Sequence, residues 1–333
     1  MTDEEIIFQE CGLQIDRVGE LALLIADVFN ACRESKASLR PSGLEDSLFA
    51  RLVATQAVAG YLVASDVLLG LDRRMHILAE RVCYGVVLKE PFGAGTDFIV
   101  IRGTASLLEW LVNAECELVG VPSITTAGKV ELGFSSIFTS MQFLAADSTG
   151  DAQPLLPSLM NVANGNKLVV TGHSLGAAIA SYLTLGLAKA GIGGDKLAAC
   201  LFASPRPGDQ GFADDFQSKV DNYIVINHAL DVVPKLPKEI AGFRALRDVL
   251  TFPNPNIPSV GPTIRDDLLC HHHAVCYAAL VAPGALGAYT ADAGVAPGKV
   301  SWASLLTANH DEMNCIVTDV LLVQQNLDRL RGA

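Results

Sequence analysis

One serine in the sequence stands where a nucleophile would. Ser174 is the middle residue of the pentapeptide GHSLG, which separates the apolar run KLVVTG from the helix-forming stretch LGAAIASYLTLGLA. If the run is a strand, Ser174 lies on the tight turn before a helix, and Gly172 and Gly176 leave room for that backbone. The pattern predicts an exposed, reactive hydroxyl. The alternative is a phosphate-binding turn, but neither GxGxxG nor GxxxxGK[ST] is present.

A serine hydroxyl reacts only when a base takes its proton, and an imidazole base needs a carboxylate to hold its tautomer. On a strand-turn-helix of this kind the chain order is serine, acid, histidine. Asp231 follows the strand-like run YIVINHA and precedes VVPKLP, which places it at the carboxyl edge of a sheet. It is the candidate acid, the alternative being an ordinary turn aspartate.

The base comes from a run of three histidines. His271, His272 and His273 open a helical stretch, and at most one of them can reach back over the strand ends. The other four histidines fit the role less well. His228 is too close to the acid in the sequence, and His76 and His310 lie on helical patterns. His173 is the filler residue of the pentapeptide. The residues alone leave the choice among the three open.

Acyl transfer also needs hydrogen-bond donors for the developing oxyanion, each of which contributes about 3 kcal/mol in other enzymes. The backbone N–H of Leu175, next after the nucleophile, is one such donor. The second should come from the loop after an earlier strand. DFIVIRGT ends such a strand, so Thr104 is expected to offer its N–H and its hydroxyl.

The elements that would hold these residues follow from the apolar pattern. KLVVTG, AACLFAS and YIVINHA are short apolar runs that alternate with helical patterns, as a parallel sheet covered on both faces requires. RVCYGVVLKE and DFIVIRG, joined by PFGAGT, predict two paired strands, while VELGF predicts a strand and FSSIFTSMQFLA a helix. The fold class is therefore α/β.

No boundary divides the chain sharply, so one domain is expected over residues 1–333. Residues 1–82 have amphipathic helical patterns and predict an N-terminal helical region. Residues 83–281 contain the alternating core, and 282–333 predict a Gly-, Ala- and Pro-rich loop followed by a C-terminal helix.

Charge and composition exclude several classes of protein. A net charge of −12 and a pI near 5.0 argue against a nucleic-acid partner and against electrostatic docking on anionic membrane. The apolar runs are too interrupted for a transmembrane segment, and the acidic N-terminus is unlike a secretory signal. We expect a soluble protein, either cytoplasmic or exported without a recognisable signal peptide.

One motif suggests a metal, but weakly. CHHHAVC places three histidines between two cysteines, yet consecutive side chains diverge and no second CxxC or HxxxH supports a site. We therefore expect no metal and no cofactor. A metal protein built on this motif remains an alternative, which predicts loss of function with a chelator.

Five segments in order resemble the successive motifs of the class 3 lipases, the fungal-lipase-like branch of the α/β hydrolases: IRGTASLLEW, VELGF, VVTGHSLG, FASPRPGD and NHALDVVPKLP. The resemblance covers roughly residues 83–281. It implies an α/β-hydrolase fold, with a mostly parallel central sheet flanked by helices. The N-terminal helices would be an extension, which the family core does not explain. It also implies Ser174 as nucleophile, Asp231 as acid, and Thr104 with Leu175 as the oxyanion hole.

The resemblance further implies a lid that begins just after Thr104. Trp110 falls where fungal members have a lid tryptophan, although a helix residue packed on the core is an equal alternative. The apolar, substrate-facing side of this lid would consist of Leu107, Leu108, Trp110 and Leu111.

Family members often place the catalytic histidine a few residues before a tyrosine. Tyr277 therefore favours His272 as the base, with His273 as the second choice. The chain departs from the family pattern at Glu131, where VHxGF has histidine, and at Ala177, where a glycine is usual. Neither change removes a catalytic group.

The function implied is that of a serine carboxylester hydrolase, either a triacylglycerol lipase or a lipid esterase, which acts through an acyl-enzyme. Its partner would be a lipid or a small ester, met at a lipid–water interface. Alternatives are a phospholipase A-type acyl hydrolase and a catalytically silent lipase-like protein used for binding or regulation. The sequence does not specify an oligomeric state.

Overall fold

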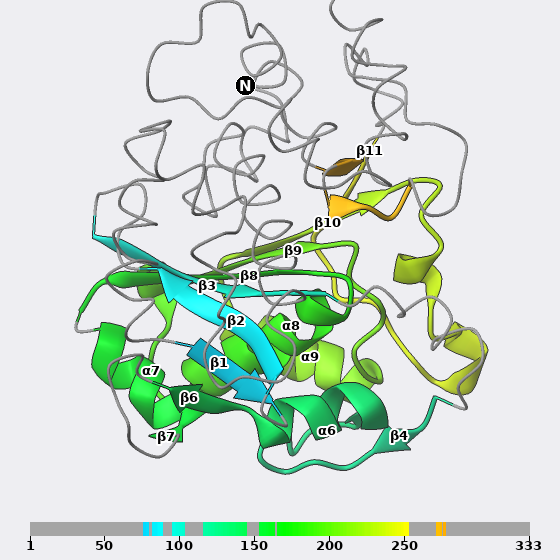
Figure 1. Ribbon diagram of the computed structural model, residues 1–333. Coiled ribbons are helices and arrows are strands. Elements are labelled where there is room, and N and C mark those ends of the chain that lie inside the picture. The colour runs from blue at the N-terminus through cyan, green and yellow to red at the C-terminus, as the bar shows by residue number, and fades with distance from the viewer. Residues whose placement is uncertain are drawn as a thin grey trace, which may run out of the picture.

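The computed structural model describes residues 76–79, 82–88, 95–103, 116–144, 153–163, 165–252, 271–274 and 276–277. The described strands form a nine-stranded sheet in the order β11-β10-β9-β8-β3-β2-β1-β6-β7, and a two-stranded sheet, β4-β5 (Figure 1). The strands are β1 (His76–Ala79), β2 (Val82–Leu88), β3 (Thr96–Ile101), β4 (Leu118–Val119), β5 (Val130–Glu131), β6 (Gln142–Leu144), β7 (Gln153–Pro154), β8 (Lys167–His173), β9 (Leu197–Phe202), β10 (Tyr223–His228) and β11 (Val249–Phe252).

One half of the large sheet is parallel. Strand β3 pairs in parallel with β8, β8 with β9, β9 with β10, and β10 with β11. The registers align the strand ends, with Ile101 opposite Gly172 and His173 opposite Phe202. The carboxyl ends of these strands therefore lie along one edge of the sheet. Strands β8, β9 and β10 are the three apolar runs expected from the sequence, so the predicted α/β fold is confirmed.

The other half is antiparallel. Strand β2 pairs with β3, which confirms the predicted pairing of these two runs, and β1 pairs with β2 on one side and β6 on the other. The helical assignment of His76 was wrong, because it lies in β1 opposite Val86 and Leu144. Backbone pairing on both sides of a short segment outweighs its local helical pattern.

The stretch after β5 also differs from its prediction. Helix α6 (Leu132–Ser140) begins inside VELGF, because the Glu131 carboxylate accepts a hydrogen bond from the N–H of Phe134 and caps the helix. The helix ends at Met141, which is extended. Gln142–Leu144 then forms β6 instead of continuing the expected helix, since it pairs with both β1 and β7.

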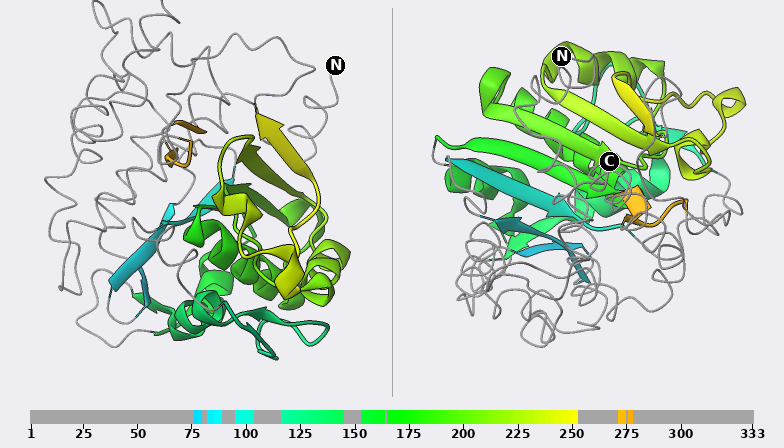
Figure 2. Two further views of the ribbon diagram at one scale, coloured as in Figure 1. Left: turned by 90° about the vertical axis from the view of Figure 1, so that its right-hand side faces the viewer. Right: turned by 90° about the horizontal axis from the view of Figure 1, so that it is seen from above.

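The described helices gather on one face of the sheet. Helix α8 (Leu175–Lys189) packs on β3, β8 and β9, and every residue from 175 to 187 is buried. Three further helices contact α8: α6, α7 (Leu155–Ala163) and α9 (Gln210–Lys219). In Figure 1, α8 and α9 lie below β3, β8 and β9, and the right panel of Figure 2 shows the strands side by side from above. The alanines at 177, 178 and 180, all fully buried, allow α8 to lie close to the sheet.

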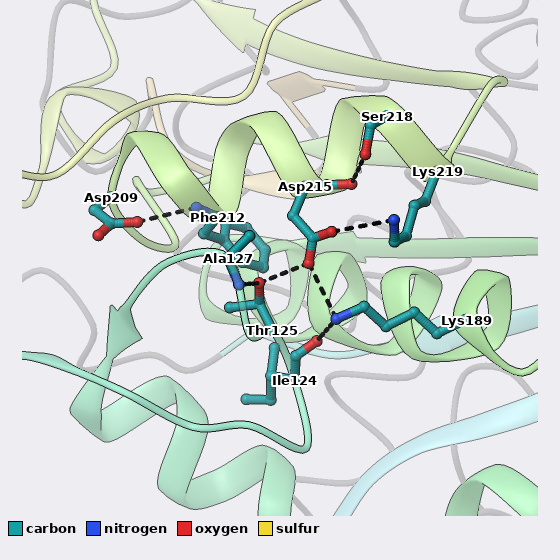
Figure 3. Close-up of polar contacts among 9 residues, drawn as sticks. All are labelled: Ile124, Thr125, Ala127, Lys189, Asp209, Phe212, Asp215, Ser218 and Lys219. Carbon is teal, nitrogen blue, oxygen red and sulfur yellow. Dashed lines mark hydrogen bonds and ion pairs between the residues drawn. The ribbon is translucent and has the colours of Figure 1, made fainter.

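A buried carboxylate ties the helices to the loop between β4 and β5. Asp215 of α9 accepts a 2.6 Å hydrogen bond from Thr125 Oγ1 and forms ion pairs with Lys189 at 3.0 Å and Lys219 at 3.4 Å (Figure 3). Lys189 also donates to the carbonyl of Ile124. These favourable partners lower the pKa of Asp215 despite its burial. The cluster fixes the end of α8 relative to α9.

The loop after β10 is held by an arginine. Arg206 donates to the carbonyl oxygens of Lys235 and Pro237 and pairs with Glu239 at 2.8 Å. Its contacts fall within or next to two 3-10 helices of this loop, η2 (Val233–Lys235) and η3 (Glu239–Ala241). Another 3-10 helix, η1 (Gly194–Lys196), precedes β9 and takes no part in these contacts. The segment that contains Asp231 is thereby fixed at the sheet edge.

Residues 1–75 of the helical region predicted over 1–82, the lid predicted after Thr104, and the loop and helix predicted over 282–333 lie outside the described residues, and the single-domain organisation stays a prediction. Among the described helices, none has the length and apolar character needed to cross a bilayer.

Candidate active site

The turn between β8 and α8 has the strained backbone expected of an elbow. Ser174 has φ 61° and ψ −130°, a combination that L residues rarely adopt. A Cβ atom at Gly172 would lie 2.4 Å from the carbonyl oxygen of Gly176, and one at Gly176 would lie 2.4 Å from that of Ile101. Both glycines are therefore required by close backbone approach, as the sequence predicted.

The carboxyl end of β3 lies against this elbow. A Cβ atom at Gly103 would lie 3.2 Å from the Cβ of Ser174 and 2.8 Å from the carbonyl oxygen of His173. Thr104, the predicted second oxyanion donor, lies outside the described residues. Leu175 is the first residue of α8, so its N–H belongs to the amides that have no partner within a helix.

Three side chains from distant segments meet at the elbow. Nε2 of His272 lies 2.7 Å from Oγ of Ser174, and Nδ1 of the same ring lies 2.8 Å from Oδ2 of Asp231. The carboxylate can only accept, so Nδ1 carries the proton and Nε2 is left to accept from the serine hydroxyl. The structure thus brings together Ser174, Asp231 and His272, and the ring between them is not that of His273.

The carboxylate is fully buried, and other donors help to satisfy it. Asp231 accepts a 2.9 Å hydrogen bond from the N–H of Val233 on Oδ1 and a 2.7 Å hydrogen bond from the hydroxyl of Tyr277 on Oδ2. The Tyr277 hydroxyl in turn accepts from the N–H of His228 at 2.9 Å. Burial, followed by the charge of Asp231, raises the pKa of Tyr277 well above its ordinary value, so its hydroxyl remains a donor.

Three further histidines lie around the site. The ring of His271 packs on that of His228 with 4.9 Å between centroids. Burial, and then the neighbouring His271, lowers the pKa of His228 to about 4. His173 is also buried, and its Nε2 lies 2.6 Å from the carbonyl oxygen of His272.

The hydroxyl of Ser174 was predicted to be exposed, and this was wrong. The residue is only 1% exposed, because the elbow is enclosed by its neighbours from β3 and by the ring of His272. The predicted lid residues lie outside the described part of the chain, namely Leu107, Leu108, Trp110 and Leu111.

Sequence reasoning used Tyr277 only as a landmark and dismissed His173 as filler, yet both contact the triad. A tyrosine at a fixed distance after a candidate histidine was the available signal for the first. For His173 the signal was its position beside the serine. Within the described residues, no three His, Cys, Asp or Glu side chains group as metal ligands, and Cys270 of CHHHAVC lies outside them.

A sheet with a parallel half, and with a strained serine between strand β8 of that half and a buried helix, defines an α/β hydrolase. Residues 98–240 match the family described as Lipase (class 3), which confirms the resemblance seen in the sequence motifs. Over this segment the chain is similar to the class 3 lipases.

Individual relatives are similar over part of the chain. Phospholipase A1-II 1 of Oryza sativa subsp. indica is 28% identical over 206 residues, which are 56% of this chain and 51% of the relative. A lipase of Rhizomucor miehei is 31% identical over 150 residues, 44% of this chain and 39% of the relative. The chain therefore spans about half the length of the first relative and less of the second.

Among solved structures, a mutant form of MDLA from Penicillium cyclopium is 26% identical, with a TM-score of 0.43. That match covers 53% of this chain and 60% of the other.

Proposed function

We propose that this protein is a serine carboxylester hydrolase that cleaves the acyl ester bonds of lipids. One observation carries the proposal: the continuous path from Asp231 through the ring of His272 to the hydroxyl of Ser174, with contacts of 2.8 and 2.7 Å. The strained backbone of Ser174 supports it, because strain of this kind persists where a side chain must be presented for reaction.

The acylation step follows from these contacts. Oγ of Ser174 attacks the ester carbonyl carbon while Nε2 of His272 takes the hydroxyl proton. Asp231 holds the ring in the correct tautomer and stabilises its positive form. The imidazolium then returns the proton to the departing alcohol as the ester C–O bond breaks, which leaves a Ser174 acyl ester.

Water completes the cycle by the same route. His272 takes a proton from water, the hydroxide attacks the acyl carbonyl, and the proton returns to Oγ of Ser174 as the carboxylic acid leaves. The N–H of Leu175 would stabilise both oxyanions, with Thr104 as the proposed second donor. The position of Gly103 against the elbow supports Thr104, because it brings the end of β3 to the serine.

Acylglycerols are the substrate that we propose first. The class 3 lipase match supports this choice, and so does the named lipase among the relatives. The lid leucines and Trp110 would meet the acyl chain or the lipid surface. A phospholipid is the second candidate, because the rice relative is a phospholipase A1.

A fluorophosphonate probe tests the chemistry. We expect stoichiometric labelling of the wild-type protein at Ser174 and none of Ser174→Ala, with loss of ester hydrolysis in the same variant. A folded wild-type protein that neither labels nor hydrolyses any ester would instead support the silent, regulatory alternative.

Substrate class is tested separately with purified protein. Release of fatty acid is measured from an acyl-chain series of triacylglycerols and from phosphatidylcholine of matched chains, below and above the solubility limit. Faster turnover of triacylglycerol supports the first candidate. Faster release from phospholipid supports the second.

A further inference from the structure

The filler histidine of the pentapeptide makes a specific contact with the base. Nε2 of His173 lies 2.6 Å from the backbone carbonyl oxygen of His272, a residue 99 positions away in the sequence. A carbonyl oxygen can only accept, so Nε2 of His173 carries the proton and donates.

The surroundings of His173 keep it in that donor form. Burial, followed by the proximity of His272, lowers its pKa well below the ordinary value, so the ring stays neutral with one proton. Its ring lies 4.7 Å from that of His272, centroid to centroid, and meets Tyr277 edge-on at 5.7 Å. The side chain is therefore held in one orientation by packing on both sides.

The end of β3 packs against the same residue. A Cβ atom at Gly103 would lie 2.8 Å from the carbonyl oxygen of His173 and 3.4 Å from its Nδ1. His173 thus lies between the segment that leads to the proposed oxyanion loop and the segment that contains the base.

We propose that His173 is a positioning residue that sets the imidazole of His272 against Ser174. The inference rests on the proposed function. The base is fixed to two adjacent residues: its side chain contacts Ser174 at 2.7 Å, and its main chain contacts His173 at 2.6 Å. Two attachments, one through the ring and one through the backbone, determine both the distance and the direction of Nε2. The other ring contact, from Nδ1 to Oδ2 of Asp231, orients the ring itself, whereas His173 holds the main chain from which the ring projects.

Three substitutions separate this role from simple packing. In His173→Gln the amide nitrogen can occupy the place of Nε2 and still donate to the carbonyl. In His173→Asn the amide is too short to do so, and His173→Leu has no donor. Misplacement of a reacting group by about 1 Å can cost about 100-fold in rate, so we expect Leu and Asn to lower kcat between about 10- and 100-fold. We expect His173→Gln to recover most of this loss.

The measurements are kcat and KM on a soluble ester, the second-order rate of fluorophosphonate labelling, and the urea midpoint of each variant. A positioning role predicts that kcat and the labelling rate fall together while KM is unchanged. If Gln is as slow as Asn at an equal urea midpoint, or if Leu retains wild-type kcat, the inference is overturned and the proposed function stands. If Ser174→Ala retains hydrolysis, the proposed function itself fails.

The comparison of Gln with Asn remains decisive if the Leu variant does not fold. Both of these variants are polar and differ by one methylene group, so a general loss of packing affects them similarly. Only the hydrogen bond to the carbonyl of His272 distinguishes them.

Discussion

The hydroxyl of Tyr277 donates a hydrogen bond of 2.7 Å to Oδ2 of Asp231, the same oxygen that accepts from the ring of His272. The hydroxyl also accepts from the buried N–H of His228. One phenol therefore connects the acid of the triad to the end of β10, the strand that positions it.

Replacing Tyr277 by phenylalanine should weaken both ends of this connection. An unsatisfied buried donor costs about 1–3 kcal/mol, so we expect the free energy of unfolding of Tyr277→Phe to fall by that amount in urea titrations. The rate of ester hydrolysis should fall as well, because Asp231 loses a contact that orients it. An unchanged unfolding free energy would show that the N–H of His228 finds another acceptor.

Asp231→Asn tests the acid directly. An amide nitrogen facing Nδ1 favours the tautomer with its proton on Nε2, and that tautomer cannot accept from Ser174. We expect kcat to drop by about 10⁴-fold, as for equivalent changes in other triads. Hydrolysis assays with the purified variant measure this drop. A loss of less than tenfold would mean that another group orients His272.

Gly103→Ala tests the approach of β3 to the elbow. Its added Cβ would lie 2.8 Å from the carbonyl oxygen of His173 and 3.2 Å from the Cβ of Ser174, so the elbow or the strand end must move. We expect a large loss of kcat and slower fluorophosphonate labelling. Gly193→Ala is the matched control, since nothing lies within 4 Å of a Cβ there, and it should retain full activity. Equal activity of the two variants would contradict the close approach.

His228 should make the protein sensitive to acid. Its pKa is about 4 in the folded state against 6.5 ordinarily, so the unfolded chain binds a proton more readily. Stability present above pH 6.5 is therefore lost as the pH falls toward 4. We expect His228→Gln to show a smaller decrease in unfolding free energy over this range. Urea titrations at several pH values give the slope of unfolding free energy against pH for each protein. If the variant and the wild type have the same slope, His228 does not contribute to the acid sensitivity.

Glu131 should lower the stability of the protein as the pH rises, which is the opposite of the effect expected for His228. Burial raises the pKa of its carboxyl above 4.5, so the folded state binds the proton more readily and stability is lost as the pH rises through the folded-state pKa. Glu131→Gln keeps an acceptor for the N–H of Phe134 but cannot ionise. We expect it to be more stable than the wild type at pH 8, with a difference that shrinks in acid.

Glu131→Ala is the control for the helix cap. It also lacks the charge, but it removes the acceptor, and loss of a cap costs about 0.5–2 kcal/mol. If the cap outweighs the buried charge, the Glu131→Gln variant should be the most stable of the three proteins at pH 8, the wild type the next and Glu131→Ala the least stable. A Gln variant that is less stable than the wild type would contradict the effect of burial on the carboxyl.

Much of the fold followed from local patterns. The runs that became β8, β9 and β10 are apolar along their whole length, and Gly172 with Gly176 marked the elbow between β8 and α8. Strands β1 and β6 were missed, because each is short and exists through pairing with neighbours. No local pattern reports such pairing.

Part of the candidate site could also be predicted from local sequence patterns, and part of it could not. Ser174 and Asp231 were found because each directly follows a recognisable strand or turn. The residues alone left three histidines open, and only the resemblance favoured His272. The contacts of His173 and Tyr277 remained hidden because they join segments 99 and 46 residues apart. Only tertiary packing determines which residues so far apart in the sequence come into contact.

The order in which the site is completed along the chain has a consequence for biosynthesis. Its alcohol and carboxylate precede β11, whereas the imidazole follows it, 98 positions after the serine. A nascent polypeptide paused anywhere before residue 272 lacks the imidazole that contacts the serine hydroxyl. Under the proposed function, hydrolysis of acyl esters by this chain therefore begins only after translation has passed that point.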